Sequence, residues 1–126
     1  MNNEILSTPS FSAILGQDGI VRLTWIPNAE ITLAAAKESV AVVETLSQGQ
    51  IRPLLVDMRS TKSIDREARA YYGSPEMKAA NAIALLADSA VSQVIANFFL
   101  RINKPTIPTQ MFTSETEALK WLKTIV

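Results

Sequence analysis

The sequence contains no cysteine and no histidine. Disulfide bonds, thiol nucleophiles, zinc sites built on these residues and imidazole general bases are therefore excluded. Catalysis would have to use carboxylates, lysine, tyrosine or backbone groups. Glycine is also scarce, with 4 residues, and none of them is clustered as a phosphate-cradling loop requires. These absences leave few routes to an enzyme, and we expect no cofactor and no metal.

The chain has no excess of charge of either sign, because 12 Lys and Arg residues balance 12 Asp and Glu residues. A nucleic-acid-binding protein needs basic residues to displace phosphate counterions, so this balance argues against a nucleic-acid partner. No apolar run approaches the roughly 20 residues that span a bilayer, and the first residues lack the layout of a signal peptide. We therefore expect no transmembrane segment and a cytoplasmic protein.

The sequence does contain enough hydrophobic residues to form one hydrophobic core, since they make up 48% of its 126 residues. The pattern predicts a flexible N-terminus at residues 1–9 and a single domain at residues 10–126. Strands are expected at residues 10–15, 20–26, 52–58, 82–87 and 109–112, and helices are expected to begin near residues 32, 65, 88 and 114. An opening hairpin followed by alternating strands and helices predicts an α/β fold with a mostly parallel central sheet and helices packed on it.

Local signals mark where the helices begin. Thr32 and Ser114 are expected N-caps, and Asp65 is expected to accept hydrogen bonds from the free amides of the helix that follows it. In the third helix the large apolar residues recur at helical spacing. They are expected to form one buried stripe, consisting of Val91, Val94, Ile95, Phe98, Phe99 and Ile102.

Three segments also carry a resemblance to a known family. They are Leu-Leu-Val-Asp at 54–57 followed by Ile-Asp-Arg-Glu-Ala-Arg at 64–69, Ala-Leu-Leu at 84–86 leading into residues 91–105, and Met-Phe-Thr-Ser-Glu-Thr-Glu-Ala-Leu-Lys-Trp-Leu at 111–122. In this order and spacing they resemble the STAS family, the fold of bacterial anti-sigma-factor antagonists, and within it the SpoIIAA-like group. The resemblance covers about residues 10–126 and implies a regulatory domain that binds a partner protein.

The sequence departs from that family at the regulatory serine. In the regulatory members, a serine in Asp-Ser-Ser-Gly or a close variant opens the second helix and is phosphorylated to switch partner binding. Aligned on Asp65, this chain has Asp-Arg-Glu-Ala at residues 65–68 instead. The phosphorylation switch therefore does not carry over. Ser60, Thr61 and Ser63 lie just upstream as alternative acceptors, although loops are commonly rich in such residues.

Cations gather around the start of the same helix. A cation in the first turn of a helix interacts unfavourably with the helix dipole, at a cost of roughly 0.3 to 1 kcal/mol. A bound anion would offset this cost. Arg66 and Arg69 are three residues apart and so share one edge of the helix. The candidate ligand-binding or anion-binding residues are Arg59, Ser60, Lys62, Ser63, Asp65, Arg66, Arg69 and Tyr72. The alternative interpretation is a solvated helix face with ordinary ion pairs to Asp65 and Glu67.

Three functions stay open at this point. The first is a non-enzymatic binding or regulatory module of STAS type that recognises a partner protein or an anionic small molecule at residues 60–69, with a homodimer as one allowed assembly. The second is a small-molecule or lipid carrier with an apolar pocket near residues 71–77, which would need a cavity of roughly 300 Å³ or more. The third is an enzyme that uses Asp57, Asp65 or Glu67, which would need a buried carboxylate with a raised pKa.

Overall fold

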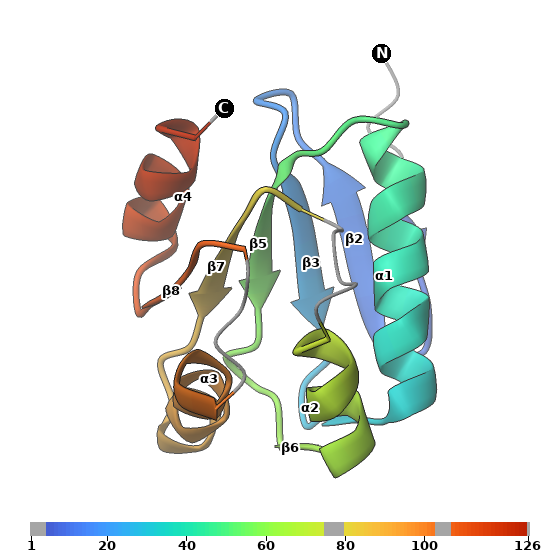
Figure 1. Cartoon of the computed structure of the whole chain (residues 1–126), viewed down its shortest axis with the longest axis vertical. Helices are drawn as coiled ribbons and strands as arrows, with labels where there is room; N and C mark the ends of the chain where they lie inside the picture. The colour runs from blue at the N-terminus through green and yellow to red at the C-terminus, as the bar shows by residue number, and fades with distance from the viewer. Residues whose placement is uncertain (1–4, 75–79, 103–106, 126) are drawn as a thin grey trace.

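The computed structural model describes residues 5–74, 80–102 and 107–125 of the chain. Its strands are β1 (Leu6–Ser7), β2 (Phe11–Leu15), β3 (Val21–Trp25), β4 (Glu30–Ile31), β5 (Pro53–Asp57), β6 (Ser63–Ile64), β7 (Ala82–Leu86) and β8 (Thr109–Phe112). Its helices are α1 (Leu33–Ser47), α2 (Arg66–Tyr72), α3 (Ala90–Ile102) and α4 (Glu115–Lys123). The predicted α/β order is confirmed (Figure 1).

The central sheet has six strands in the order β1-β2-β3-β5-β7-β8. β1, β2 and β3 are antiparallel neighbours, whereas β3, β5, β7 and β8 run parallel. The opening hairpin pairs Phe11 with Trp25 and Leu15 with Val21. The parallel strands are connected through helices, as right-handed crossover units require.

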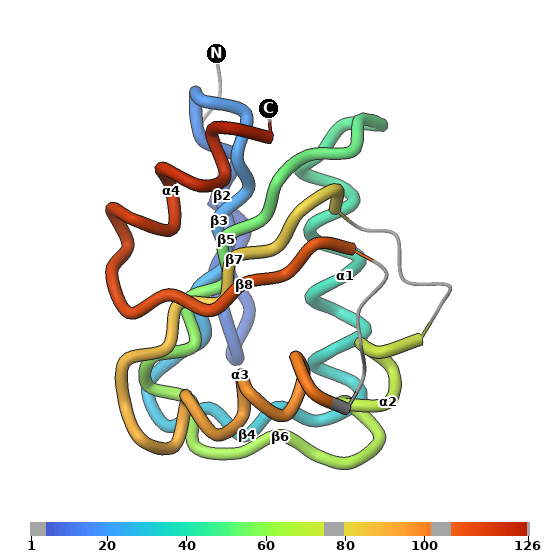
Figure 2. The backbone as a smooth tube through the Cα atoms, turned by 60° about the vertical axis from the view of Figure 1, so that its left-hand side comes forward, coloured from blue at the N-terminus to red at the C-terminus, as the bar shows by residue number. Residues whose placement is uncertain are grey.

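Both faces of the parallel strands are covered, which explains why β5 and β7 are almost continuously apolar. Alternate residues point to opposite faces, so Leu54 and Leu85 join the core beneath α1 and α3. Leu55 and Leu86 join a second core with Leu122 of α4. Figure 2 shows α1 and α4 on opposite sides of the sheet.

The hairpin turn between β2 and β3 is held by a local ion pair. Gly19 has a φ of +82°, a conformation that glycine adopts without strain. Arg22 donates two hydrogen bonds to the carboxylate of Asp18, at 2.9 and 2.8 Å, and Asp18 also accepts from the amide of Ile20. The guanidinium of Arg22 lowers the pKa of Asp18 to about 2.

Two short pairings were not predicted from the sequence. Leu6 and Ser7, which the sequence pattern assigned to the N-terminal tail, form β1 at the edge of the sheet opposite Ala13 and Ser12. β4 and β6 form a separate two-stranded parallel sheet, in which Glu30 pairs with Ser63 and Ile31 with Ile64. Strands of two residues are too short to give a recognisable alternation of apolar and polar residues.

The predicted helix caps have different outcomes. Thr32 accepts from the amide of Ala35 at 3.1 Å, and Ser114 accepts from the amide of Glu117 at 3.4 Å, so both N-caps are confirmed. Asp65 stands at the N-cap of α2, but its side chain makes no capping hydrogen bond. The prediction for Asp65 was therefore right about the position and wrong about the contact.

Candidate functional site

The segment between β5 and α2, which contains most of the predicted site residues, is fixed to the chain before α1. The amide of Asn28 donates to the carbonyl of Ser60 at 2.7 Å, and the amide of Lys62 donates to the carbonyl of Ala29 at 2.8 Å. The amide of Asp65 then donates to the carbonyl of Ile31 at 2.9 Å. These bonds continue the β4–β6 pairing and give residues 60–65 a defined backbone shape.

Two serines fix the start of α3 beside this segment. The hydroxyl of Ser89 accepts from the amide of Ser92 at 3.1 Å, and the hydroxyl of Ser92 accepts from the amide of Ser89 at 3.0 Å. This reciprocal arrangement is a capping box with serine in place of the usual glutamate. The hydroxyl of Ser89 also donates to the carbonyl of Arg59 at 3.0 Å, so it joins α3 to the β5–β6 loop.

The face that α3 presents to solvent is apolar near the start of the helix, whereas Asn97 and Arg101 are exposed further along. Val91 is 50% exposed and Val94 is 69% exposed, whereas Ser92 and Ala96 are fully buried. The predicted buried stripe is therefore wrong for both valines. Apolar residues lie on several sides of this helix, so two stripes compete for the core. The structure buries residues 92, 95 and 96, with Phe99 half-buried beside them. The small residues of this stripe allow the helix to pack closely on the core.

The exposed valines form one wall of an open groove with a volume of about 410 Å³. We call it the α3 groove. It runs between α3 on one side and β6 with α2 on the other. The residues that line it are Lys62, Ser63, Ile64, Arg69, Ala90, Val91, Val94, Ile95 and Phe98.

The charge in the α3 groove is positive. The guanidinium carbon of Arg69 lies 4.1 Å from the ring centroid of Phe98, a cation–π contact that holds the guanidinium against the opposite wall. Lys62 is exposed at the groove. None of the described residues that line the groove is acidic. The groove therefore combines an apolar wall with the exposed cation of Lys62, which suits a ligand that has both apolar and acidic groups.

The structure brings only part of the predicted site together. Lys62, Ser63 and Arg69 line the groove, whereas Ser60, Asp65 and Arg66 are exposed outside its lining. Since α2 has seven residues and its N-cap makes no side-chain bond, the predicted anion site at the start of this helix gains no support from the geometry.

Arg59 is engaged elsewhere. Its guanidinium donates to both oxygens of Asp57, at 3.0 and 2.8 Å, and lies 3.9 Å from Glu115. These carboxylates raise the pKa of Arg59, first through the hydrogen bond to Asp57. The pairing holds Asp57 in a structural contact, while Asp65 and Glu67 are exposed. None of the three carboxylates considered for catalysis is therefore buried.

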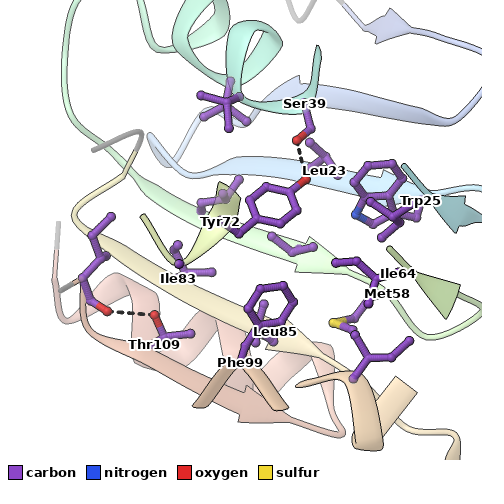
Figure 3. Close-up of a pocket in the computed structure, with 18 residues that line it drawn as sticks. Leu23, Trp25, Ser39, Met58, Ile64, Tyr72, Ile83, Leu85, Phe99 and Thr109 are labelled. Carbon is purple, nitrogen blue, oxygen red and sulfur yellow. Dashed lines mark hydrogen bonds between the residues drawn. The ribbon is translucent and has the colours of Figure 1, made fainter. Parts of the chain in front are cut away.

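Tyr72 points into the protein, away from the other candidates. Its hydroxyl lies 2.6 Å from the hydroxyl of Ser39 on α1, and burial raises its pKa above the ordinary value. Figure 3 shows its ring beside Phe99 and Leu85 at an interior cavity between the sheet and the helices. The cavity has a volume of about 120 Å³, which is smaller than the predicted carrier requires. Met77, the other end of the predicted pocket, lies outside the described residues.

The interior cavity and the α3 groove share a wall. Ile64 of β6 and Ile95 of α3 line both spaces. The sequence pattern assigned Val91 and Val94 to the core, whereas both are exposed. Phe98, which was assigned to the core as well, is half-buried and lines the groove. The sequence signal that could have revealed this orientation was the second stripe, at residues 92, 95, 96 and 99. Its small residues, Ser92 and Ala96, allow the helix to approach the sheet closely.

Comparison with known families places the chain. The model of a domain of unknown function, DUF7793, matches residues 14–126. The chain belongs to this family. No curated protein matches the sequence.

Solved structures that are similar to this DUF7793 domain confirm the predicted SpoIIAA-like fold. An uncharacterized protein of the DUF3478 family with a SpoIIAA-like fold, from Shewanella loihica PV-4, aligns with a TM-score of 0.62 at 13% identity, over 93% of this chain and 98% of that one. An anti-sigma factor antagonist from Mycobacterium paratuberculosis aligns with a TM-score of 0.58 at 13% identity, over 94% and 99%.

A protein of unknown function from Arthrobacter sp. FB24 is 48% identical over 87% of this chain and 96% of that one, with a TM-score of 0.36. Within the residues that the structure describes, no helix combines the length and the apolar character needed to cross a membrane.

Proposed function

We propose that this domain is a non-enzymatic regulatory module that binds a partner protein in the α3 groove. The observation that carries the proposal is the exposure of Val91 and Val94 next to the cation of Arg69. Exposed apolar residues on a regular helix, rimmed by charge, are typical of a surface that is covered by a partner. The similarity in fold to an anti-sigma factor antagonist supports the same class of function.

The chemistry of the groove favours an amphipathic segment with acidic residues. Apolar side chains of such a segment would cover Val94 and Phe98, while its carboxylates would pair with the exposed Lys62. A free phosphate or another small anion would use the cation of Lys62 but would leave the valines in water. The apolar wall is therefore the reason to prefer a protein segment over a small anionic ligand.

The test uses two groove variants and one matched control. Val94→Asp and Lys62→Glu place negative charge in the groove. Ile51→Asp makes the same kind of change at a residue that is 63% exposed, between α1 and β5 at the opposite end of the sheet (Figure 1). Immobilised wild-type protein captures candidates from a lysate of the native organism. Each purified candidate is then titrated against all four proteins by calorimetry.

We expect the true partner to bind wild type and Ile51→Asp with equal affinity and to bind each groove variant at least tenfold more weakly. Equal binding to all four proteins, or no candidate that binds wild type, would refute the groove as a protein-binding site. A phosphate-dependent rise in thermal midpoint that Lys62→Glu abolishes would assign the groove to a small anion instead. A solution mass of twice 13.8 kDa that Val94→Asp reduces to one chain would assign it to a second copy of this protein.

A further inference from the structure

The interior cavity lies between the sheet and the helices α1, α2 and α3. Its walls are mainly aliphatic and aromatic, with Leu23, Val43 and Leu85 among them. The rings of Tyr72 and Phe99 meet there with their centroids 5.8 Å apart. Native cores contain few voids larger than a water molecule, so a space of about 120 Å³ in this position needs an explanation.

Water is a poor occupant, because the hydroxyl groups that reach the cavity are already engaged. Thr109 donates to the carbonyl of Ile107 at 2.8 Å. Ser39 lies 2.6 Å from the carbonyl of Ala36, and since a carbonyl has no proton, Ser39 must donate there. The proton shared between Ser39 and Tyr72 then comes from Tyr72. A water molecule needs two to four polar partners, and these walls offer few.

The remaining hydrogen-bonding capacity is of one kind. A phenolic oxygen that donates its proton keeps lone pairs, so Tyr72 can still accept a hydrogen bond. Ser39 has used its proton on Ala36. The Ser39–Tyr72 pair therefore offers an acceptor to a ligand and no further proton.

We propose that this cavity binds a small apolar molecule about the size of one aromatic ring, with at most one hydrogen-bond donor directed to Tyr72. An engineered apolar cavity of about 150 Å³ in another protein binds benzene and stays free of water, which sets the scale. The cavity here is of that order and too small for an acyl chain or a drug-sized ligand. The proposal for this cavity does not rest on the partner proposed for the α3 groove, although Ile64 and Ile95 line both spaces.

The first experiment titrates benzene and then phenol into the wild-type protein and follows methyl signals by NMR. Ile83 and Leu85 line the cavity, whereas Ile20 and Leu122 belong to the core on the other face of the sheet and serve as the internal control. We expect saturable shifts at Ile83 and Leu85 with no comparable change at Ile20 and Leu122. Equal shifts at both sets, or none at either, would overturn the proposal.

Variants of α1 then locate the ligand. Val40→Phe extends a half-buried lining residue into the cavity and is expected to weaken benzene binding at least tenfold. Val42→Phe makes the same change two residues away, at a half-buried position outside the lining, and should leave binding unchanged. If Val40→Phe does not fold, Val40→Leu replaces it, with a smaller loss of affinity expected. Benzene affinity equal to wild type in a folded Val40 variant would overturn the site.

The hydroxyl is tested with phenol. Tyr72→Phe removes the acceptor, so we expect it to lose any preference for phenol over benzene while it keeps benzene binding. A phenol preference that survives in Tyr72→Phe would contradict the proposed direction of the hydrogen bond.

Discussion

Replacement of Val94 by alanine tests the orientation of α3, on which the groove depends. Val94 is 69% exposed, so its side chain has about a third of the burial that a core valine has. At about 1.5 kcal/mol for full burial, the loss is roughly 0.5 kcal/mol. Alanine also has a higher helix propensity than a β-branched residue, and this difference stabilises the variant by up to about 0.7 kcal/mol. The two effects nearly cancel, and we expect the free energy of unfolding of Val94→Ala to lie within about 0.5 kcal/mol of the wild-type value.

The assay is urea denaturation followed by circular dichroism, with Ile95→Ala measured alongside. Ile95 is the next residue on the same helix but is 8% exposed, so its truncation is expected to cost about 2 to 5 kcal/mol. A loss of 2 kcal/mol or more in Val94→Ala would place Val94 in the core. Such a result would refute both the orientation of α3 and the existence of the groove.

Three further predictions follow from individual contacts. Asp18→Asn removes the ion pair with Arg22 and is expected to cost about 1 kcal/mol at pH 7, since the pair is partly exposed. The pKa of Asp18 is lowered to about 2, so its contribution is complete above about pH 4 and is lost as the pH falls towards 2. Tyr72→Phe is expected to cost about 1 kcal/mol, because it removes the hydrogen bond to Ser39. Leu122→Ala empties a fully buried position beneath α4 and is expected to cost about 2 to 5 kcal/mol.

Chemical denaturation checks all three, with the Asp18 pair measured at several pH values. A stability difference between wild type and Asp18→Asn that stays constant from pH 7 to pH 2 would contradict the role given to Arg22. An unchanged Tyr72→Phe would mean that the Ser39 contact adds no stability. A loss below 1 kcal/mol in Leu122→Ala would show that α4 contributes little to the second core.

Long elements with a regular pattern could be predicted from the sequence. The alternation of Val21, Leu23 and Trp25 identified a strand with one buried face, and all three residues are buried. The hydroxyl side chains of Thr32 and Ser114 located two helix starts, because a capping contact involves neighbours only three residues away. Contacts of this kind can be predicted because both partners lie close together in the sequence.

The candidate site was harder to predict because it depends on contacts between distant segments. The orientation of α3 is set by the docking of Ser89 on the carbonyl of Arg59 and by the close packing of Ala96, and neither is visible in the spacing of large apolar residues. Position in sequence also grouped Tyr72 with Arg69, although Tyr72 lines the interior cavity and Arg69 lines the α3 groove. Lys62 and Arg69 were among the predicted site residues and line the groove, but the apolar wall that they face was not predicted.

The isoleucines that separate the groove from the cavity have a thermodynamic consequence. Ile64 and Ile95 form a single layer, so a molecule that displaces either side chain on one side alters the volume available on the other. Linked equilibria are reciprocal: the factor by which one occupant changes the affinity of the second equals the factor by which the second changes the first. Enlarging or reducing these two side chains leaves the polar contacts of both ligands in place. It would therefore change the coupling free energy between binding in the α3 groove and binding in the interior cavity.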